Sequence, residues 1–172
     1  QKAVEQAKDE ARRMEDLGVN GIIIENAGDI PYVRPENIGY ETVASLSFIA
    51  NEISRVVSIP YGIICLANGA IPSLAIAAAT GASFVRVNLW AHAYVAIEGL
   101  LNGPAAEALR YRSFIKSEEI KIMADVHVKF GAHSITMDRP IHELAKDVEN
   151  FGAEILIATG ERNGSPTSIE EV

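Results

Sequence analysis

A repeated pattern along the chain constrains the fold more than any other feature of the sequence. Three segments each begin with a glycine able to end a helix, continue through a short turn into an apolar run, and finish on polar residues. These segments span residues 18–26, 81–88 and 152–160. Two similar apolar runs lie between them, at 59–65 and 120–125. Short β-branched runs of this kind are typical of buried strands.

Helical segments separate these five strands. Apolar residues recur at spacings of three and four within residues 3–17 and 36–57. Shorter helical patterns follow at 72–80, 104–116 and 141–150. Apolar strands that alternate with helices predict an α/β fold with a parallel sheet covered by helices.

Two parallel architectures fit this pattern, an open doubly wound sheet and a (β/α)8 TIM barrel. No G-x-G-x-x-G motif follows a strand, so the dinucleotide-binding fold lacks its best marker. Every strand ends in polar groups, and a barrel gathers all of its strand ends at one mouth. A full barrel takes about 250 residues, whereas this chain has 172. We therefore favour an incomplete barrel, with residues 1–172 as a single truncated domain built from the five units.

Composition and charge exclude several classes of protein. Hydrophobic residues make up 48% of the chain and charged residues 22%, which indicates a globular protein rather than a disordered one. The net charge of −8 argues against binding nucleic acid through bulk charge. No apolar run reaches the roughly 20 residues of a membrane helix, so we expect no integral membrane segment. The single cysteine, Cys65, excludes an internal disulfide and predicts a buried, inert thiol in a reducing, cytoplasmic compartment.

Polar side chains follow a period of two along two of the predicted strands. Arg86 and Asn88 share one face of the first strand, and Asp125, His127 and Lys129 share one face of the second. The opposite faces are apolar and must meet the helices. We therefore expect all five polar side chains to point into one cavity at the barrel mouth.

Charges in such a place are costly unless they are paired, so we expect Arg86 to pair with Asp125 or Glu25. Because barrel interiors are usually filled by Val, Ile and Leu, a polar cluster favours a functional site over a structural layer of ion pairs. Asp125, His127 and Lys129, assisted by Glu25, are the candidates for acid–base catalysis. Two alternatives are a Schiff base on Lys129 and a divalent metal held by Glu25, Asp125 and His127.

The connecting loops add further candidates. The loop after the first strand is suited to facing a ligand, and the Gly-rich loop that starts at Thr159 can cradle an anion. The candidate substrate-binding residues are Asn26, Asp29, Arg86, Asn88, Thr159 and Gly160. The long connection at 89–103 is expected to be either a lid or a short helix. We also expect Asn68 and Gly69 to cap the helix that follows them.

Five strings, taken together and in order, resemble the BtpA/SgcQ family over nearly the whole chain. They lie at residues 24–29, 75–82, 85–88, 109–112 and 124–129. The resemblance implies a ribulose-phosphate-binding-like barrel whose first strand and last two strands lie outside this chain, together with the usual phosphate site. The loop from Thr159 is similar to the Thr-Gly repeat of the family, with Asn163 in the place of a second Thr.

Two functions follow as hypotheses. The first is an enzyme of the isomerase or lyase type, acting on a phosphorylated sugar or nucleoside-like metabolite. The second, which the name of the family implies, is a non-catalytic factor for the assembly of photosystem I-type complexes. We favour the enzyme because a purely structural role leaves the polar cluster unexplained. We expect a small anionic metabolite as partner, no nucleic acid, a divalent metal as the only suggested cofactor, and a homo-oligomer as in many soluble barrels.

Overall fold

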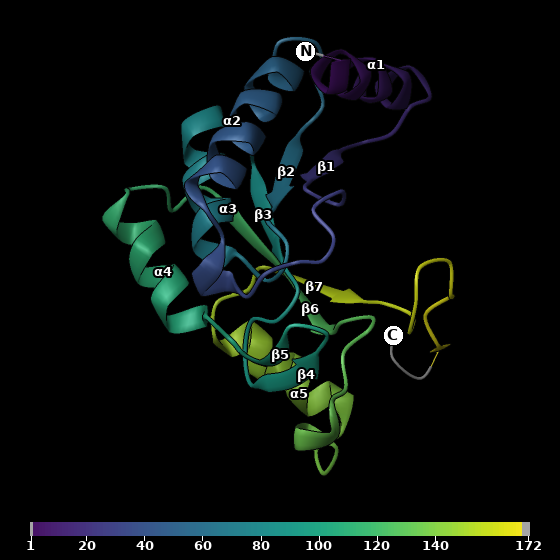
Figure 1. Cartoon of the computed structure of the whole chain (residues 1–172). Helices are drawn as coiled ribbons and strands as arrows, with labels where there is room; N and C mark the ends of the chain where they lie inside the picture. Colours follow the sequence, from purple (N-terminus) through teal and green to yellow (C-terminus); the bar gives the residue numbers. More distant parts are fainter. Residues whose placement is uncertain (1, 170–172) are drawn as a thin grey trace.

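The computed structural model describes residues 2–169 and contains a parallel five-stranded sheet (Figure 1). The order of the strands across the sheet is β1-β2-β3-β6-β7. The strands are β1 (Ile22–Glu25), β2 (Tyr61–Ile64), β3 (Phe84–Val87), β6 (Lys121–His127) and β7 (Ile155–Ala158). The five predicted strands and their parallel pairing are therefore confirmed.

Helices occupy the connections between the strands. They are α1 (Lys2–Asp16), α2 (Tyr40–Ser54), α3 (Ala70–Thr80), α4 (Ala105–Phe114) and α5 (Ile141–Asn150), with 3-10 turns η1 (Pro35–Asn37) and η2 (Ser134–Thr136). Helix α2 begins later than the predicted residue 36 because η1 forms a separate turn before it. In Figure 1, α2, α3 and α4 lie along the same face of the sheet. None of these helices combines the length and the apolar character needed to cross a bilayer.

The repeated glycines have a common physical role. Gly18, Gly81 and Gly152 follow α1, α3 and α5 with φ angles of 83°, 79° and 88°. This left-handed conformation ends a helix, and glycine adopts it at little cost because it has no Cβ. The chain can therefore turn from each of these helices directly into the next strand.

The core lies between the sheet and the helices. Ile63, Val85 and Ile122 lie on three neighbouring strands and point toward the helices. They are completely buried, together with Leu74 and Ile76 of α3, and we call this face of the sheet the outer face. Along β3 the exposure alternates as predicted, with the valines buried and the residues between them partly exposed. Arg86 therefore lies on the opposite face of the sheet, which points away from these helices and which we call the inner face.

Strand β6 departs from regular alternation at its carboxyl end. Asp125 pairs with Ile157, whereas His127 pairs with Ala158, so β6 has one more residue than β7 over this step. A bulge of this kind changes the direction of the side chains that follow it. The face predicted for Asp125, His127 and Lys129 assumed regular pairing, and this bulge interrupts it.

The connection at 89–103 does not form the helix that was one of its two expected forms. It contains an antiparallel hairpin of β4 (Ala93–Ala96) and β5 (Gly99–Asn102). The hairpin is anchored by a small apolar cluster of Leu89, Tyr94, Leu101 and Val128. The helical alternative is therefore wrong. The connection instead forms a hairpin that projects beside the strand ends.

Candidate functional site

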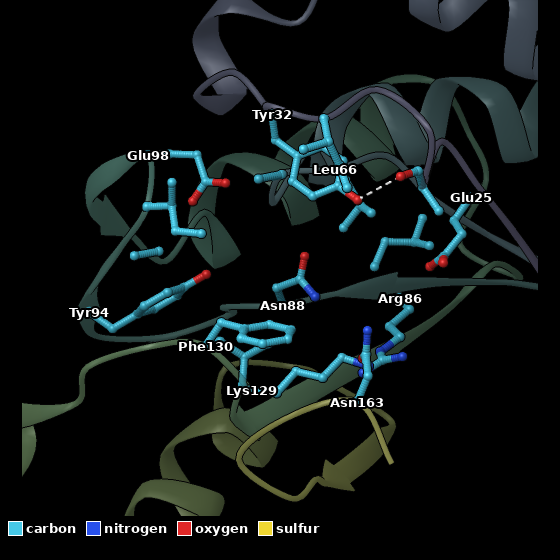
Figure 2. A pocket seen from close by; sticks show the side chains of 17 residues that line it. Glu25, Tyr32, Leu66, Arg86, Asn88, Tyr94, Glu98, Lys129, Phe130 and Asn163 are labelled. Atoms are coloured by element: carbon cyan, nitrogen blue, oxygen red, sulfur yellow. Dashed lines mark hydrogen bonds between the residues drawn. The ribbon is translucent and has the colours of Figure 1, made fainter. Parts of the chain in front are cut away.

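A cavity of about 280 Å³ lies at the carboxyl ends of the parallel strands, and we call it the strand-end cavity (Figure 2). Its charged and amide lining residues are Glu25, Arg86, Asn88, Glu98, Lys129 and Asn163. Glu25 ends β1, Arg86 and Asn88 come from the end of β3, and Lys129 follows β6. Because parallel strands end at the same edge of a sheet, residues distant in sequence meet here.

A buried charge pair lies beside this cavity. The guanidinium Nη2 of Arg86 donates to both carboxylate oxygens of Asp125, at 2.9 and 3.2 Å, and its Nε donates at 3.3 Å. The Asn88 side chain also donates to Asp125, at 3.4 Å. The Asp125 side chain is completely buried, whereas Arg86 reaches the cavity. The pairing of Arg86 with Asp125 that we expected from the sequence is confirmed.

The titration of Asp125 reflects two opposing influences. Burial raises its pKa above the ordinary value for a carboxyl group, and the hydrogen bonds and positive charge of Arg86 oppose this rise. Asn88 and the Lys129 ammonium add smaller opposing effects. The carboxylate is thus fully enclosed and held by its neighbours, which suits it to fix the position of Arg86.

The other end of the strand-end cavity is aromatic. Figure 2 shows Tyr94 and Glu98 at one end, and Arg86, Lys129 and Asn163 at the other. Phe130 and Tyr32 also line the cavity, and the Tyr32 hydroxyl donates to the Ala27 carbonyl at 3.0 Å. Burial, followed by nearby carboxylates, raises the pKa of both tyrosines, so their hydroxyl groups remain neutral donors at pH 7. The cavity therefore has one end with Arg86 and Lys129, which we call the charged end, and one with Tyr94 and the Glu98 carboxylate, which we call the aromatic end.

His127, Thr159 and Gly160 line a different cavity, which we call the histidine cavity. It measures about 430 Å³ and also includes His133 and Arg162. The rings of His127 and His133 are stacked with centroids 4.3 Å apart. The Thr159 hydroxyl donates to the His127 carbonyl at 3.1 Å. The structure therefore does not bring all five predicted polar side chains into one cavity, because the bulge in β6 separates His127 from Lys129.

Asn26 and Asp29 lie in a third place, beside α2. They line a cavity of about 240 Å³ together with Glu25. The Asn26 side chain accepts a hydrogen bond from the Leu66 N–H at 2.7 Å and donates to the Leu66 carbonyl at 3.2 Å. It also donates to Asp29 at 3.0 Å. Asn26 thus ties the loop after β1 to the loop after β2, a structural task that the sequence did not reveal.

The described residues do not support the metal alternative. Within residues 2–169, no three His, Cys, Asp or Glu side chains are grouped so that they could hold a metal ion. Glu25, Asp125 and His127 therefore do not form the predicted ligand set: Asp125 is engaged by Arg86, and His127 faces the histidine cavity.

The thiol of Cys65 is buried, as predicted. Burial raises its pKa to about 11, so it remains protonated at pH 7.

The aromatic wall of the strand-end cavity was not among the predicted site residues. Tyr94 and Glu98 lie on the hairpin, and Phe130 follows Lys129. In the sequence, the one available signal was the period-two alternation of side chains on either side of Gly99. That alternation could have indicated a hairpin, and with it side chains beside the strand ends.

Comparison with known proteins places the chain in a family. The model of the BtpA family matches residues 1–172. An uncharacterised mitochondrial protein of Caenorhabditis elegans is 41% identical over 90% of the chain and 57% of its own length. An uncharacterised protein of Archaeoglobus fulgidus is 37% identical over 98% of the chain and 66% of its own length.

A third relative has a name that refers to a process. The photosystem I biogenesis protein BtpA of Synechocystis is 34% identical over 98% of the chain and 58% of its own length. The chain thus spans about three fifths of the length of these relatives. The family match over the whole chain agrees with the resemblance inferred from the sequence. The chain belongs to the BtpA family.

Proposed function

We propose that this chain forms the catalytic part of a (β/α)8 barrel enzyme that acts on a small anionic, hydroxylated metabolite. The parallel sheet with α2, α3 and α4 along one face supports the barrel, because a doubly wound sheet carries helices on both faces. Ile23 on the inner face of β1 is 38% exposed, and Ile155 on the edge strand β7 is 40% exposed. Closure of the barrel by further strands would cover such residues.

The observation that carries the proposal is the Arg86–Asp125 pair at the wall of the strand-end cavity. A buried pair of charges costs desolvation energy, and apolar residues of similar size would fill the space with less penalty. Arg86 nevertheless presents its guanidinium to the cavity beside Asn88 and Lys129. These three side chains offer donors to phosphate, carboxylate or hydroxyl oxygens.

We assign the acid–base chemistry to two of the charged residues that line the cavity, Glu25 and Lys129. Glu25 carries a carboxylate and Lys129 an ammonium, and they approach the cavity from different strands. One accepts a proton from the substrate while the other donates one, as isomerase and lyase reactions require. Asp125 acts as a positioning residue through Arg86, because its own side chain is enclosed.

The aromatic side chains of the cavity bear on which class of metabolite fits it. Tyr94 lies at the end away from Arg86, and Phe130 and Tyr32 add rings to the cavity between the two ends. A phosphorylated sugar would use mainly the charged end, and a nucleoside-like metabolite would use both ends. His127, Thr159 and Gly160 remain candidates for a neighbouring part of the same substrate, because the histidine cavity shares Val128 and Phe130 with the strand-end cavity.

The test is a screen of the complete protein against sugar phosphates and nucleosides, read by thermal shift and by turnover. We expect Lys129→Met and Glu25→Gln each to abolish turnover with an unchanged melting temperature. Lys146→Met, which changes an exposed lysine on α5, is the matched control and keeps full activity. A screen without any ligand, or variants that retain turnover, would overturn the proposal.

The assembly-factor alternative has one supporting observation, the name of the Synechocystis relative. It predicts that substitutions at the strand-end cavity leave the biological function intact. Complementation by Lys129→Met of a strain that lacks the protein would favour this alternative. Loss of complementation, together with a measured ligand, would favour the enzyme.

A further inference from the structure

The aromatic end of the strand-end cavity carries two polar groups that the acid–base chemistry does not use. They are the Tyr94 hydroxyl and the Glu98 carboxylate, and Figure 2 shows both turned toward the cavity at this end. Neither group makes a hydrogen bond or an ion pair within residues 2–169. Tyr94 is only 4% exposed, so its hydroxyl has little access to bulk water. A ligand in the cavity would supply the partner that a buried polar group normally has.

The hairpin holds these two groups in place. Its turn is the two-residue segment 97–98, between β4 and β5. Val95 and Ala132 exchange two backbone hydrogen bonds, at 3.1 and 2.8 Å, which attach the hairpin to the loop after β6. Arg34 donates to the Leu100 carbonyl at 3.3 Å, which attaches the hairpin to the segment after β1. The turn that carries the carboxylate is therefore attached on two sides before any ligand binds.

The two groups offer complementary hydrogen bonds. Burial, followed by the charge of Glu98, raises the pKa of Tyr94, so its hydroxyl remains a neutral donor at pH 7. An ionised carboxylate such as that of Glu98 only accepts hydrogen bonds. A ligand that satisfies both groups must present a donor beside an acceptor. The base edges of adenine and cytosine present an amine beside a ring nitrogen that accepts, whereas uracil and hypoxanthine present a carbonyl beside an N–H.

The rest of the cavity fits the other parts of such a ligand. Figure 2 shows Tyr32 above and Phe130 below the space between the two ends, and aromatic rings stabilise a flat base by stacking. Arg86 and Lys129 at the charged end supply donors and positive charge for a phosphate group. The volume of about 280 Å³ lies near the lower end of the range of ligand pockets, about 300–1,000 Å³. The cavity therefore suits one mononucleotide rather than a larger cofactor.

We propose that the strand-end cavity takes a nucleoside monophosphate whose base carries an amine beside a ring nitrogen, as adenine and cytosine do. The Glu98 carboxylate accepts a hydrogen bond from the amine, and the Tyr94 hydroxyl donates to the ring nitrogen. The phosphate meets Arg86 and Lys129. This inference rests on the proposed function and deepens it, because it names the substrate class of the same cavity and assigns Glu98 and Tyr94 as the residues that determine specificity.

The experiment titrates the complete protein calorimetrically with two matched pairs of nucleotides. The pairs are the 5′-monophosphates of cytidine and uridine, and those of adenosine and inosine; the second member of each pair has a carbonyl in place of the amine. We expect the amino member of at least one pair to bind about tenfold or more tightly than its partner, because the Glu98 carboxylate repels a carbonyl oxygen. If no pair shows tighter binding of its amino member, or if none of the four nucleotides binds, the inference is overturned.

Two variants test whether the aromatic end is the source of the discrimination. Glu98→Gln keeps the size of the side chain and can turn an amide donor toward a carbonyl, so it should reduce the preference for the amino member to about threefold or less. Tyr94→Phe keeps the ring but removes the donor, so it should weaken binding of the amino member about fivefold. Glu119→Gln and Tyr40→Phe, which change exposed residues outside the cavity, are the matched controls and alter neither quantity. If either cavity variant behaved like its control, the assignment would be wrong.

The same measurements separate this inference from the proposed function. Because binding is read without turnover, discrimination within a pair in a protein that catalyses no reaction would support the inference and overturn the enzyme. Turnover of a sugar phosphate by a protein that binds none of the four nucleotides would support the enzyme and overturn the inference.

Discussion

On the outer face of the sheet Ile63, Val85 and Ile122 are completely buried against the helices, whereas on the inner face Arg86 and Asp125 form a charge pair at the edge of a cavity. The outer face stabilises the fold through apolar burial, which needs no particular orientation. The inner face depends on specific hydrogen bonds, and the removal of one partner leaves the other charge buried and unpaired. The two faces should therefore respond differently to substitution.

The largest effect is expected for Arg86→Met. It removes the partner of a buried carboxylate, and breaking such a pair costs about 3–5 kcal/mol of the unfolding free energy. Urea unfolding monitored by circular dichroism measures this loss. Arg110→Met, which changes a largely exposed arginine on α4, should alter the unfolding free energy by less than about 0.5 kcal/mol.

The double variant Arg86→Met with Asp125→Leu sharpens the comparison. Removing both charges leaves no unpaired charge, so most of the lost stability should return, apart from the weak hydrogen bond that Asn88 donates to Asp125. A double variant that is less stable than Arg86→Met alone would show that the pair stabilises the fold directly, and the two faces would then not differ in the way we describe.

On the outer face we expect a smaller loss for Ile63→Ala. Truncation of a buried isoleucine costs about 2–4 kcal/mol through lost burial and the space left behind. Because Ile63 does not line the strand-end cavity, ligand affinity at that cavity should be unchanged under conditions where the variant is folded. A loss of affinity as large as that of Arg86→Met would break the separation between the faces.

The same contrast explains what could be predicted from the sequence. The repeated glycines and apolar runs predicted five parallel strands because each depends on local requirements, a left-handed helix end and a buried strand. Period-two alternation placed Arg86 and Asn88 on the inner face and Asp125 close enough to pair with Arg86. These features follow from rules that act over a few residues.

The other features of the site depend on long-range geometry, which local sequence patterns do not predict. One additional residue in β6 opposite β7 separates His127 from Lys129, and a bulge leaves no clear mark in an apolar strand. The hairpin of β4 and β5 lies in a stretch that mixes alanine and leucine, which favour a helix, with aromatic and β-branched residues, which favour a strand. Asn68 was expected to cap α3, but its side chain binds the Leu89 N–H because the chain brings β3 alongside.

The pH dependence of stability offers a finer probe of the inner face. Burial raises the pKa of Asp125, so the folded protein keeps this proton to a higher pH than the unfolded chain. Between the two pKa values the folded state binds more protons, and the contribution of Asp125 to stability falls as the pH rises. Asp125→Asn lacks this titration. The unfolding free energy of the variant minus that of the wild type should therefore increase from about pH 4 upward. Urea titrations at successive pH values measure this difference. A difference that stays constant or decreases with pH would contradict the prediction.

The smallest effect on stability is expected at the hairpin tip. Ile97 is 86% exposed and yet lines the strand-end cavity. Because little apolar surface is buried there, Ile97→Ser should change the unfolding free energy by no more than about 0.5 kcal/mol. It should nevertheless weaken ligand binding at the cavity several-fold, because it removes an apolar wall, whereas Ile135→Ser outside the cavity should not. Calorimetric titration with any ligand found in the screen measures this difference, and equal affinities for the two variants would show that the hairpin is only a neighbour of the site.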